Sequence, residues 1–247
     1  MRISIITACL NNENTIEGTI NSVFSQDYPD MEYIVIDGGS TDSTLEIISR
    51  YRNNIDYFIS EPDQNMYEAI NKGIYNATGD IIGLLHSDDE FYSTDVLSAV
   101  AKVFEKKDTD IVYGDGVYVN KYNTDKVVRN WISGEYKKSA IRHGWLPLHP
   151  TVYAKKRIFD EAGYYNEFYR IAGDTDWLIK VLYKYDFNVY YLHKYLVKMR
   201  MGGLSTSLTL KGQIEKWEED IRLYKKNGLN AHYNLFRKVL RKIKQFR

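Results

Sequence analysis

Two adjacent aspartates, Asp88 and Asp89, closely follow the apolar run at 81–85. Neighbouring carboxylates repel each other, and beside a buried strand they need a counter-charge. A hard divalent cation such as Mn²⁺ or Mg²⁺ supplies that charge, prefers oxygen ligands and lets substrate phosphates complete its coordination. The alternative is that one of the two aspartates caps a helix that begins near Ser93 or Thr94.

Polar residues also follow two earlier apolar runs. Thr7 and Ala8 end the first run, and Asp37 ends the second within the segment DGGSTD. Asp37 could accept a hydrogen bond from a ribose or a base. The same segment also suits a strand-to-helix turn in which Ser40 or Thr41 is the cap.

Asp174 precedes a helical pattern within the segment GDTDW. A carboxylate at such a junction can act as a general base, or it can simply cap the helix. Two histidines are further candidates for ligand contacts: His149 in PLHPT and His193 at the end of a strand-like run. A structural role is the alternative for both, because an isolated histidine is more often structural than a ligand.

These side chains need a scaffold that brings strand ends together, and strand-like and helix-like segments alternate over the first 113 residues. The strand-like runs lie at 2–8, 33–36, 57–60, 81–85 and 110–113, and the helical patterns at 13–26, 44–50, 67–77 and 96–104. This order predicts an α/β fold, with a largely parallel sheet between helices. Ligands of such sheets bind at the carboxyl ends of the strands, where three of the polar clusters fall.

After about residue 115, strand-like and helix-like segments no longer alternate regularly, and the second half of the fold is expected to be less regular. Residues 116–120 and 126–131 suggest a hairpin. Helices are expected at 156–162, 175–185 and 208–226, and short strands at 188–192 and 196–199.

The net charge, the cysteine count and the length of the apolar stretches exclude some classes of protein. The 247 residues include 33 lysines and arginines and 33 aspartates and glutamates, so the formal net charge is zero, which argues against a nucleic-acid partner. The single cysteine, Cys9, excludes an internal disulfide and fits a reducing compartment. No apolar stretch approaches the ~18 residues of a membrane span, and no secretory signal precedes the first strand-like run.

The charged residues are unevenly distributed along the chain. Residues 235–247, LFRKVLRKIKQFR, carry six basic and no acidic side chains, so they hold +6 and residues 1–234 hold −6. Leu235, Val239, Ile243 and Phe246 recur at helical spacing. The pattern predicts a basic amphipathic helix that contacts anionic lipid, and the alternative is a helix that packs on the body of the protein.

Taken together, the ordered segments resemble the family-2 inverting glycosyltransferases of GT-A fold, most of all the bacterial enzymes that build surface polysaccharides. The resemblance covers roughly residues 2–205. The segments that carry it are SIITACLNNENTIEGTINSVFSQ, YIVIDGGSTDST, SEPDQNMYEAINKGIYNATGDIIGLLHSDDEFY, HPTVYAKKRIFDEAGYYNEFYRIAGDTDW and MGGLS.

The resemblance implies a donor site for a nucleotide-sugar. Thr7, Ala8 and Asp37 lie where the family contacts the base or ribose of a UDP-sugar. Asp63 and Lys72, from the SEPDQ and NKG segments, are further donor-site candidates.

The resemblance also implies a metal site and a base. Asp88 and Asp89 match the family's DxD-type motif, which binds the nucleotide-sugar together with Mn²⁺ or Mg²⁺, and Asp89 is the principal metal ligand. Asp174 matches the catalytic aspartate, which usually follows a glutamate. Here Gly173 precedes it, so Asp176 stays open as an alternative base.

The implied reaction transfers a hexose or N-acetylhexosamine from a nucleotide-sugar to a lipid-diphosphate-linked saccharide, as in O-antigen, capsule or exopolysaccharide synthesis. The protein must supply a cation for the leaving diphosphate and a base for the acceptor hydroxyl. The expected organisation is a GT-A domain at 1–205, with a nucleotide-sugar half at 1–115 and an acceptor half at 116–205, followed by a helical extension at 206–247.

Such an acceptor favours a cytoplasmic enzyme at the inner face of the plasma membrane, held there through residues 235–247. Two other functions compete. A sugar nucleotidyltransferase would need a glycine-rich basic loop, and residues 7–15, TACLNNENT, contain neither glycine nor a basic residue. A non-catalytic nucleotide-sugar-binding module would have no need to retain the aspartates.

Overall fold

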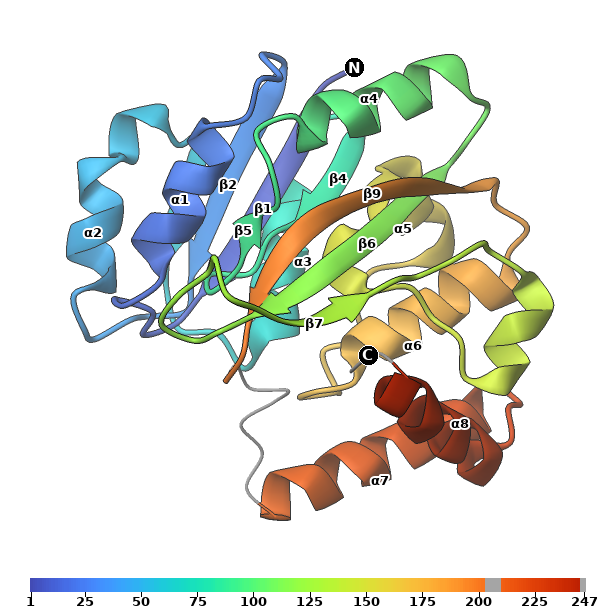
Figure 1. The fold of residues 1–247 in the computed structure, drawn as a ribbon. Coiled ribbons are helices and arrows are strands. Elements are labelled where there is room, and N and C mark those ends of the chain that lie inside the picture. Colours follow the sequence, from blue (N-terminus) through green and yellow to red (C-terminus); the bar gives the residue numbers. More distant parts are fainter. Residues whose placement is uncertain (203–209, 245–247) are drawn as a thin grey trace.

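Runs of isoleucine and valine form the first strands of the sheet, as expected for strands covered on both faces. The computed structural model describes residues 1–202 and 210–244, and Figure 1 shows its fold. All residues of the first strand are buried, and it lies between two parallel neighbours. The parallel strands are β1 (Ile3–Cys9), β2 (Met31–Asp37), β3 (Tyr57–Ser60) and β4 (Ile81–Leu84).

Further strands extend this sheet and make it mixed. Within the described ranges the sheet has nine strands in the order β3-β2-β1-β4-β8-β6-β9-β5, with β7 beside β6. β8 is antiparallel to both β4 and β6, whereas β6 and β9 are parallel. These strands are β5 (Glu90–Phe91), β6 (Ile111–Val119), β7 (Val127–Trp131), β8 (Tyr153–Lys155) and β9 (Val189–Arg200).

The expected hairpin is confirmed, because β6 and β7 pair antiparallel. The expectation of two short strands at 188–192 and 196–199 is wrong, because one strand, β9, runs through both. His193 and Lys194 interrupt the apolar pattern, yet β9 pairs with β6 on both sides of a register shift near Asp115. An irregularity in a strand ladder changes which side chains face the core without ending the strand.

Helices cover both faces of the sheet, which confirms the predicted α/β class. Side chains alternate along a strand, so Ile3 and Ile5 pack in the layer of α1, α2 and α4, whereas Ile6 and Ala8 pack with α3, α5 and α6. The helices are α1 (Ile16–Phe24), α2 (Thr44–Arg50), α3 (Met66–Asn76), α4 (Val96–Lys106), α5 (Arg157–Ala162) and α6 (Gly173–Ile179). Short 3₁₀ segments span Arg52–Asn54, Lys138–His143 and His149–Thr151, and a π-turn, Lys180–Lys184, continues α6.

Two C-terminal helices, α7 (Leu210–Lys226) and α8 (Ala231–Lys244), pack beside α6. Leu223 and Ala231 belong to the same buried cluster as Trp177 of α6. The expected boundary between residues 205 and 206, and most of the MGGLS segment, lie outside the described residues. Of the helices that are described, none combines the length and apolarity that a membrane span requires.

Candidate functional site

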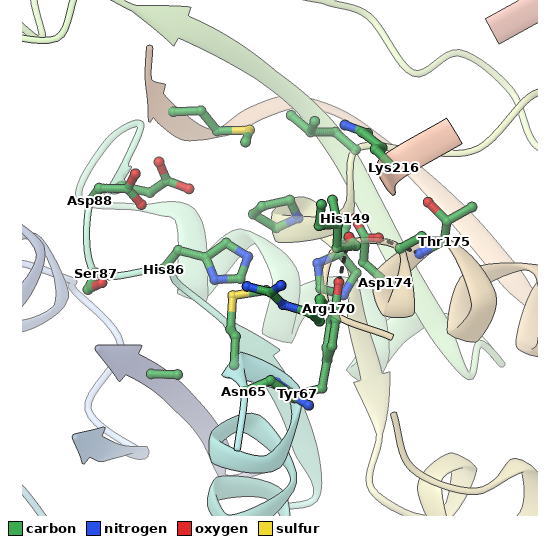
Figure 2. Close-up of a pocket in the computed structure, with 18 of the residues that line it drawn as sticks. Asn65, Tyr67, His86, Ser87, Asp88, His149, Arg170, Asp174, Thr175 and Lys216 are labelled. Carbon is green, nitrogen blue, oxygen red and sulfur yellow. Dashed lines mark hydrogen bonds between the residues drawn. The ribbon is translucent and has the colours of Figure 1, made fainter. Parts of the chain in front are cut away.

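A cavity of about 960 Å³ lies at the carboxyl ends of β1, β2 and β4, the edge where the sequence predicts ligand binding. Its walls come from the strand-end loops, from the N-terminal ends of α3 and α6, and from α7 and α8. Figure 2 shows a close-up of this cavity, with Asp88 on one side and Asp174 on the other. A volume of this size is typical of sites that bind small organic ligands.

Asp89 lies in the wall of the cavity with 2% of its surface exposed. One carboxylate oxygen accepts a hydrogen bond from the backbone N–H of Arg200 at 3.2 Å. The other, Oδ2, is buried and has no hydrogen-bond partner within the described residues. Burial, and then the neighbouring carboxylate of Asp88, raise the pKa of Asp89 well above its usual value.

This donor set fits a hard divalent cation. A bare carboxylate oxygen of Asp89 lies beside a second carboxylate, Asp88, which also lines the cavity. Across residues 1–202 and 210–244, no three Asp, Glu, His or Cys side chains are grouped as metal ligands. Mg²⁺ commonly binds through one or two carboxylates and takes its other ligands from phosphates and water. Asp88 and Asp89 are therefore the residues that could hold such an ion.

Asp174 lies in the first turn of α6 and lines the cavity near His149 and Thr175. Its Oδ1 accepts a hydrogen bond from the backbone N–H of Thr175 at 2.6 Å. The preceding Gly173 packs on a buried tyrosine, because a Cβ there would lie 2.7 Å from the ring of Tyr67. Tyr67 therefore occupies the space that a glutamate before Asp174 would need.

Asp176 does not line the cavity. It is buried, accepts a hydrogen bond from the side-chain amide of Asn227 at 3.2 Å, and lies 3.5 Å from the ammonium group of Lys226. Both partners belong to the end of α7 and the turn after it. Of the two aspartates in GDTDW, Asp174 is the one that faces the cavity.

Asp37 ends β2 as expected, whereas Thr7 lies within β1, which continues to Cys9, and neither residue lines the cavity. The Asp37 carboxylate accepts hydrogen bonds from the backbone N–H groups of Gly39 and Ser40 and from the hydroxyls of Ser40 and Ser60. The Thr7 hydroxyl donates to the carbonyl of Leu85 at 2.8 Å. In this structure Asp37 organises the strand-to-helix turn.

Ala8, Gly38 and Asp63 form the cavity wall at this end. One carboxylate oxygen of Asp63 lies 2.5 Å from the ammonium group of Lys72, while Oδ2 is buried without a hydrogen-bond partner among the described residues. Burial raises the pKa of Asp63. Lys72 does not line the cavity and also pairs with Glu61. Asp63 thus offers a buried acceptor where Asp37 does not.

The two candidate histidines are in different places. His149 lines the cavity and its Nε2 lies 2.8 Å from the hydroxyl of Tyr165, while burial lowers the pKa of His149 to about 4. His193 is exposed on β9 and pairs with Glu135 at 2.8 Å, away from the cavity. His86 is not among the site residues predicted from the sequence, although it lies in the same HSDD segment as Asp88 and lines the cavity.

Comparison with known proteins identifies the family. The glycosyl transferase family 2 model matches residues 4–171, and the chain belongs to this family. It is 29% identical over 225 residues to a PGL/p-HBAD biosynthesis glycosyltransferase of Mycobacterium bovis, covering 89% of this chain and 85% of the relative. An uncharacterized glycosyltransferase of Mycobacterium tuberculosis is 31% identical over 180 residues, which are 72% of this chain and 68% of that protein.

Solved structures confirm the GT-A type of α/β fold. A crystal structure of S. aureus TarS, residues 1–349, superimposes with a TM-score of 0.69 at 21% identity, over 90% of this chain and 64% of that one. The same TarS segment in complex with UDP-GlcNAc gives a TM-score of 0.66 at 21% identity, over 81% of this chain and 58% of that one. The mannosyltransferase PcManGT of Pyrobaculum calidifontis, in complex with GDP-Man and Mn²⁺, superimposes with a TM-score of 0.68 at 15% identity. The match covers 91% of this chain and 63% of that one. This chain therefore spans less than two thirds of these solved chains.

Proposed function

We propose that the chain is an inverting glycosyltransferase that moves a hexose or N-acetylhexosamine from a nucleotide-sugar, in the first instance a UDP-sugar, to a lipid-diphosphate-linked saccharide. One observation carries the proposal: the carboxylates of Asp88 and Asp89 and that of Asp174 line the same cavity from different elements. The UDP-GlcNAc and GDP-Man complexes of the structural neighbours support a nucleotide-sugar donor.

Asp88 and Asp89 would bind the donor diphosphate at the end of β4. A Mn²⁺ or Mg²⁺ ion held there would neutralise the charge that appears on the leaving diphosphate. Asp63, with Ala8 and Gly38 beside it, lines the part of the cavity beyond the ends of β1 and β2, where the base of the nucleotide would bind. Its free carboxylate oxygen can accept a hydrogen bond from a base N–H group.

Asp174 is the general base of the proposed reaction. A hydroxyl of the acceptor donates its proton to Asp174 while the hydroxyl oxygen attacks the anomeric carbon. Because the attack comes from the side opposite the diphosphate, which leaves, the configuration at that carbon inverts. The acceptor would enter from the part of the cavity lined by α7 and α8, where Lys216 lies near Asp174. An acceptor attached to a lipid suits assembly of O-antigen, capsule, exopolysaccharide or a related glycolipid.

The test is a screen of UDP-, GDP- and TDP-sugars for release of the nucleoside diphosphate, with Mn²⁺ or Mg²⁺ and after removal of metal by EDTA. We expect metal-dependent release from at least one UDP-sugar. Asp174→Asn should lower turnover about 10²–10⁴-fold, the usual contribution of a general base, while UDP still binds. Near wild-type turnover in this variant would reject the base, and a protein that binds UDP-sugars without turning any over would be a binding module.

We also propose that the α7–α8 pair contacts the inner face of the plasma membrane, which adds α7 to the predicted contact through 235–247. Leu235 packs against the core, so it does not belong to the contact surface. Exposed apolar side chains instead lie on the outer sides of both helices. They are Ile214, Trp217, Phe236, Val239 and Leu240.

A further inference from the structure

His86 occupies the stretch of cavity wall between the proposed cation site and the proposed base. It follows β4 and precedes Asp88 by two residues, and its side chain lines the cavity. Asp88 and Asp174 both act electrostatically on its ring. Figure 2 shows the ring between these two carboxylates.

The ring of His86 packs against a series of other rings. It stacks on the ring of His149 with centroids 6.0 Å apart and an interplanar angle of 28°. His149 is fixed in turn by the hydroxyl of Tyr165, whose own ring stacks between Tyr67 and Trp177 at 5.9 and 5.2 Å. This chain of buried rings leaves His86 little freedom to turn away from the cavity.

The polar atoms of this ring have no protein partner. Within the described part of the chain, neither ring nitrogen of His86 makes a hydrogen bond, and neither is among the fully buried unpaired atoms, so both are open to the cavity that the half-buried residue lines. A neutral imidazole has one N–H donor and one acceptor nitrogen, which matches a hydroxyl group that can both accept and donate.

The proposed reaction places a sugar at this position. The anomeric carbon is bonded to the diphosphate at Asp88 and Asp89 and is attacked by the hydroxyl that Asp174 deprotonates. The transferred sugar must therefore span the space between the two sites, where His86 lies. We propose that His86 hydrogen-bonds a hydroxyl of the transferred sugar and thereby helps to select the donor. This inference rests on the proposed function.

The experiment separates sugar binding from nucleotide binding. The dissociation constants of UDP, and of the UDP-sugar that the wild-type protein hydrolyses fastest, are measured with Mn²⁺ present for the wild type and for His86→Phe and His86→Gln. His86→Phe should weaken UDP-sugar binding roughly tenfold, the effect of one or two lost hydrogen bonds, and leave UDP binding unchanged. His86→Gln, which retains a donor and an acceptor, should recover part of the loss.

The exposed His232 on α8 gives a matched control, since His232→Phe makes the same substitution outside the cavity. Equal losses for UDP and the UDP-sugar in His86→Phe would overturn the proposal, because they would place the residue at the diphosphate or show a damaged fold. Unchanged UDP-sugar binding in that variant would overturn it too. A wild-type protein that binds no nucleoside diphosphate would instead reject the proposed function itself.

Discussion

At the scale of single residues, the buried carboxylate of Asp89 is costly to the protein before any ligand binds. One of its oxygens lacks a hydrogen-bond partner in the described structure, and burial raises its pKa. A raised pKa means that the folded state binds the proton more tightly than the unfolded chain does. Folding stability therefore falls as the pH rises above the usual aspartate value of about 3.9.

Asp89→Asn should accordingly stabilise the metal-free protein at about pH 8. We expect its melting temperature to exceed that of the wild type by about 2–4 °C for each kcal/mol gained, and the difference to shrink at about pH 4. Mn²⁺ should raise the melting temperature of the wild type and not that of the variant. Calorimetry in EDTA and in Mn²⁺ checks both parts, and a variant that melts lower than the wild type under every condition would contradict the argument.

Most of the site residues predicted from the sequence do line the cavity, but the direction of each side chain could not be predicted from the sequence. Ala8, Asp63, Asp88, Asp89, Asp174 and His149 line it, whereas Thr7, Asp37, Lys72, Asp176 and His193 do not. Position at a strand end is visible in the sequence, but the direction of a side chain there depends on the turn that follows. Four hydrogen bonds hold the Asp37 side chain, three from the loop that follows it and one from Ser60 at the end of β3, and only the folded structure brings these donors together.

At the scale of elements, the packing of α3 against α6 explains a departure from the family pattern. Gly173 stands where the family pattern usually has a glutamate before the aspartate that Asp174 matches, and a Cβ at this position would lie 2.7 Å from the Tyr67 ring. Tyr67 is fully buried and donates a hydrogen bond to the carbonyl of Ile171 at 2.8 Å. The N-terminal turn of α6 therefore fits this chain only with glycine at its start.

Gly173→Glu, which restores the family pair, should therefore destabilise this protein by about 1–3 kcal/mol through overpacking and lower its turnover. Adding Tyr67→Ala should make the effect of the glutamate smaller than it is in the wild-type background. Urea unfolding of the four proteins in the double-mutant cycle measures this coupling. Strictly additive effects would show that the two residues do not compete for space.

The elements themselves were largely predictable, because strand-like and helical apolar patterns are strong in the first half. The pattern failed where polar residues interrupt a continuous strand, as His193 and Lys194 do in β9. It also could not show that β8 enters the sheet between β4 and β6. Strand order depends on contacts between distant segments, which local periodicity does not record.

At the scale of the whole molecule, the charge asymmetry and the apolar side chains of the C-terminal helices predict reversible membrane binding. Deleting residues 235–247 is a poor test, since Leu235 packs on the core and Lys238 pairs with the buried Asp220 at 2.9 Å. The double substitution Phe236→Ser and Val239→Ser changes two side chains that are 61% and 51% exposed.

We expect this double variant to bind phosphatidylglycerol vesicles at least about tenfold more weakly than the wild type, because each apolar side chain transferred from water contributes about 1.5–3 kcal/mol. Binding should also weaken as salt is added. Tyr122→Ser, at an 86% exposed site outside the α7–α8 pair, is the control in the same vesicle sedimentation assay. Equal binding by all three proteins would reject the membrane surface.

The shared core of α6 and the C-terminal helices has a consequence for how the protein is made. The buried cluster that seats the Asp174 helix joins Ile6 and Ile34, near the start of the chain, to Leu223 and Ala231, near its end. Contacts across so many residues cannot form until the last of them leaves the ribosome. The first strands can pair during synthesis, but the helix that carries the proposed base gains its full packing only after residue 231 has left the ribosome.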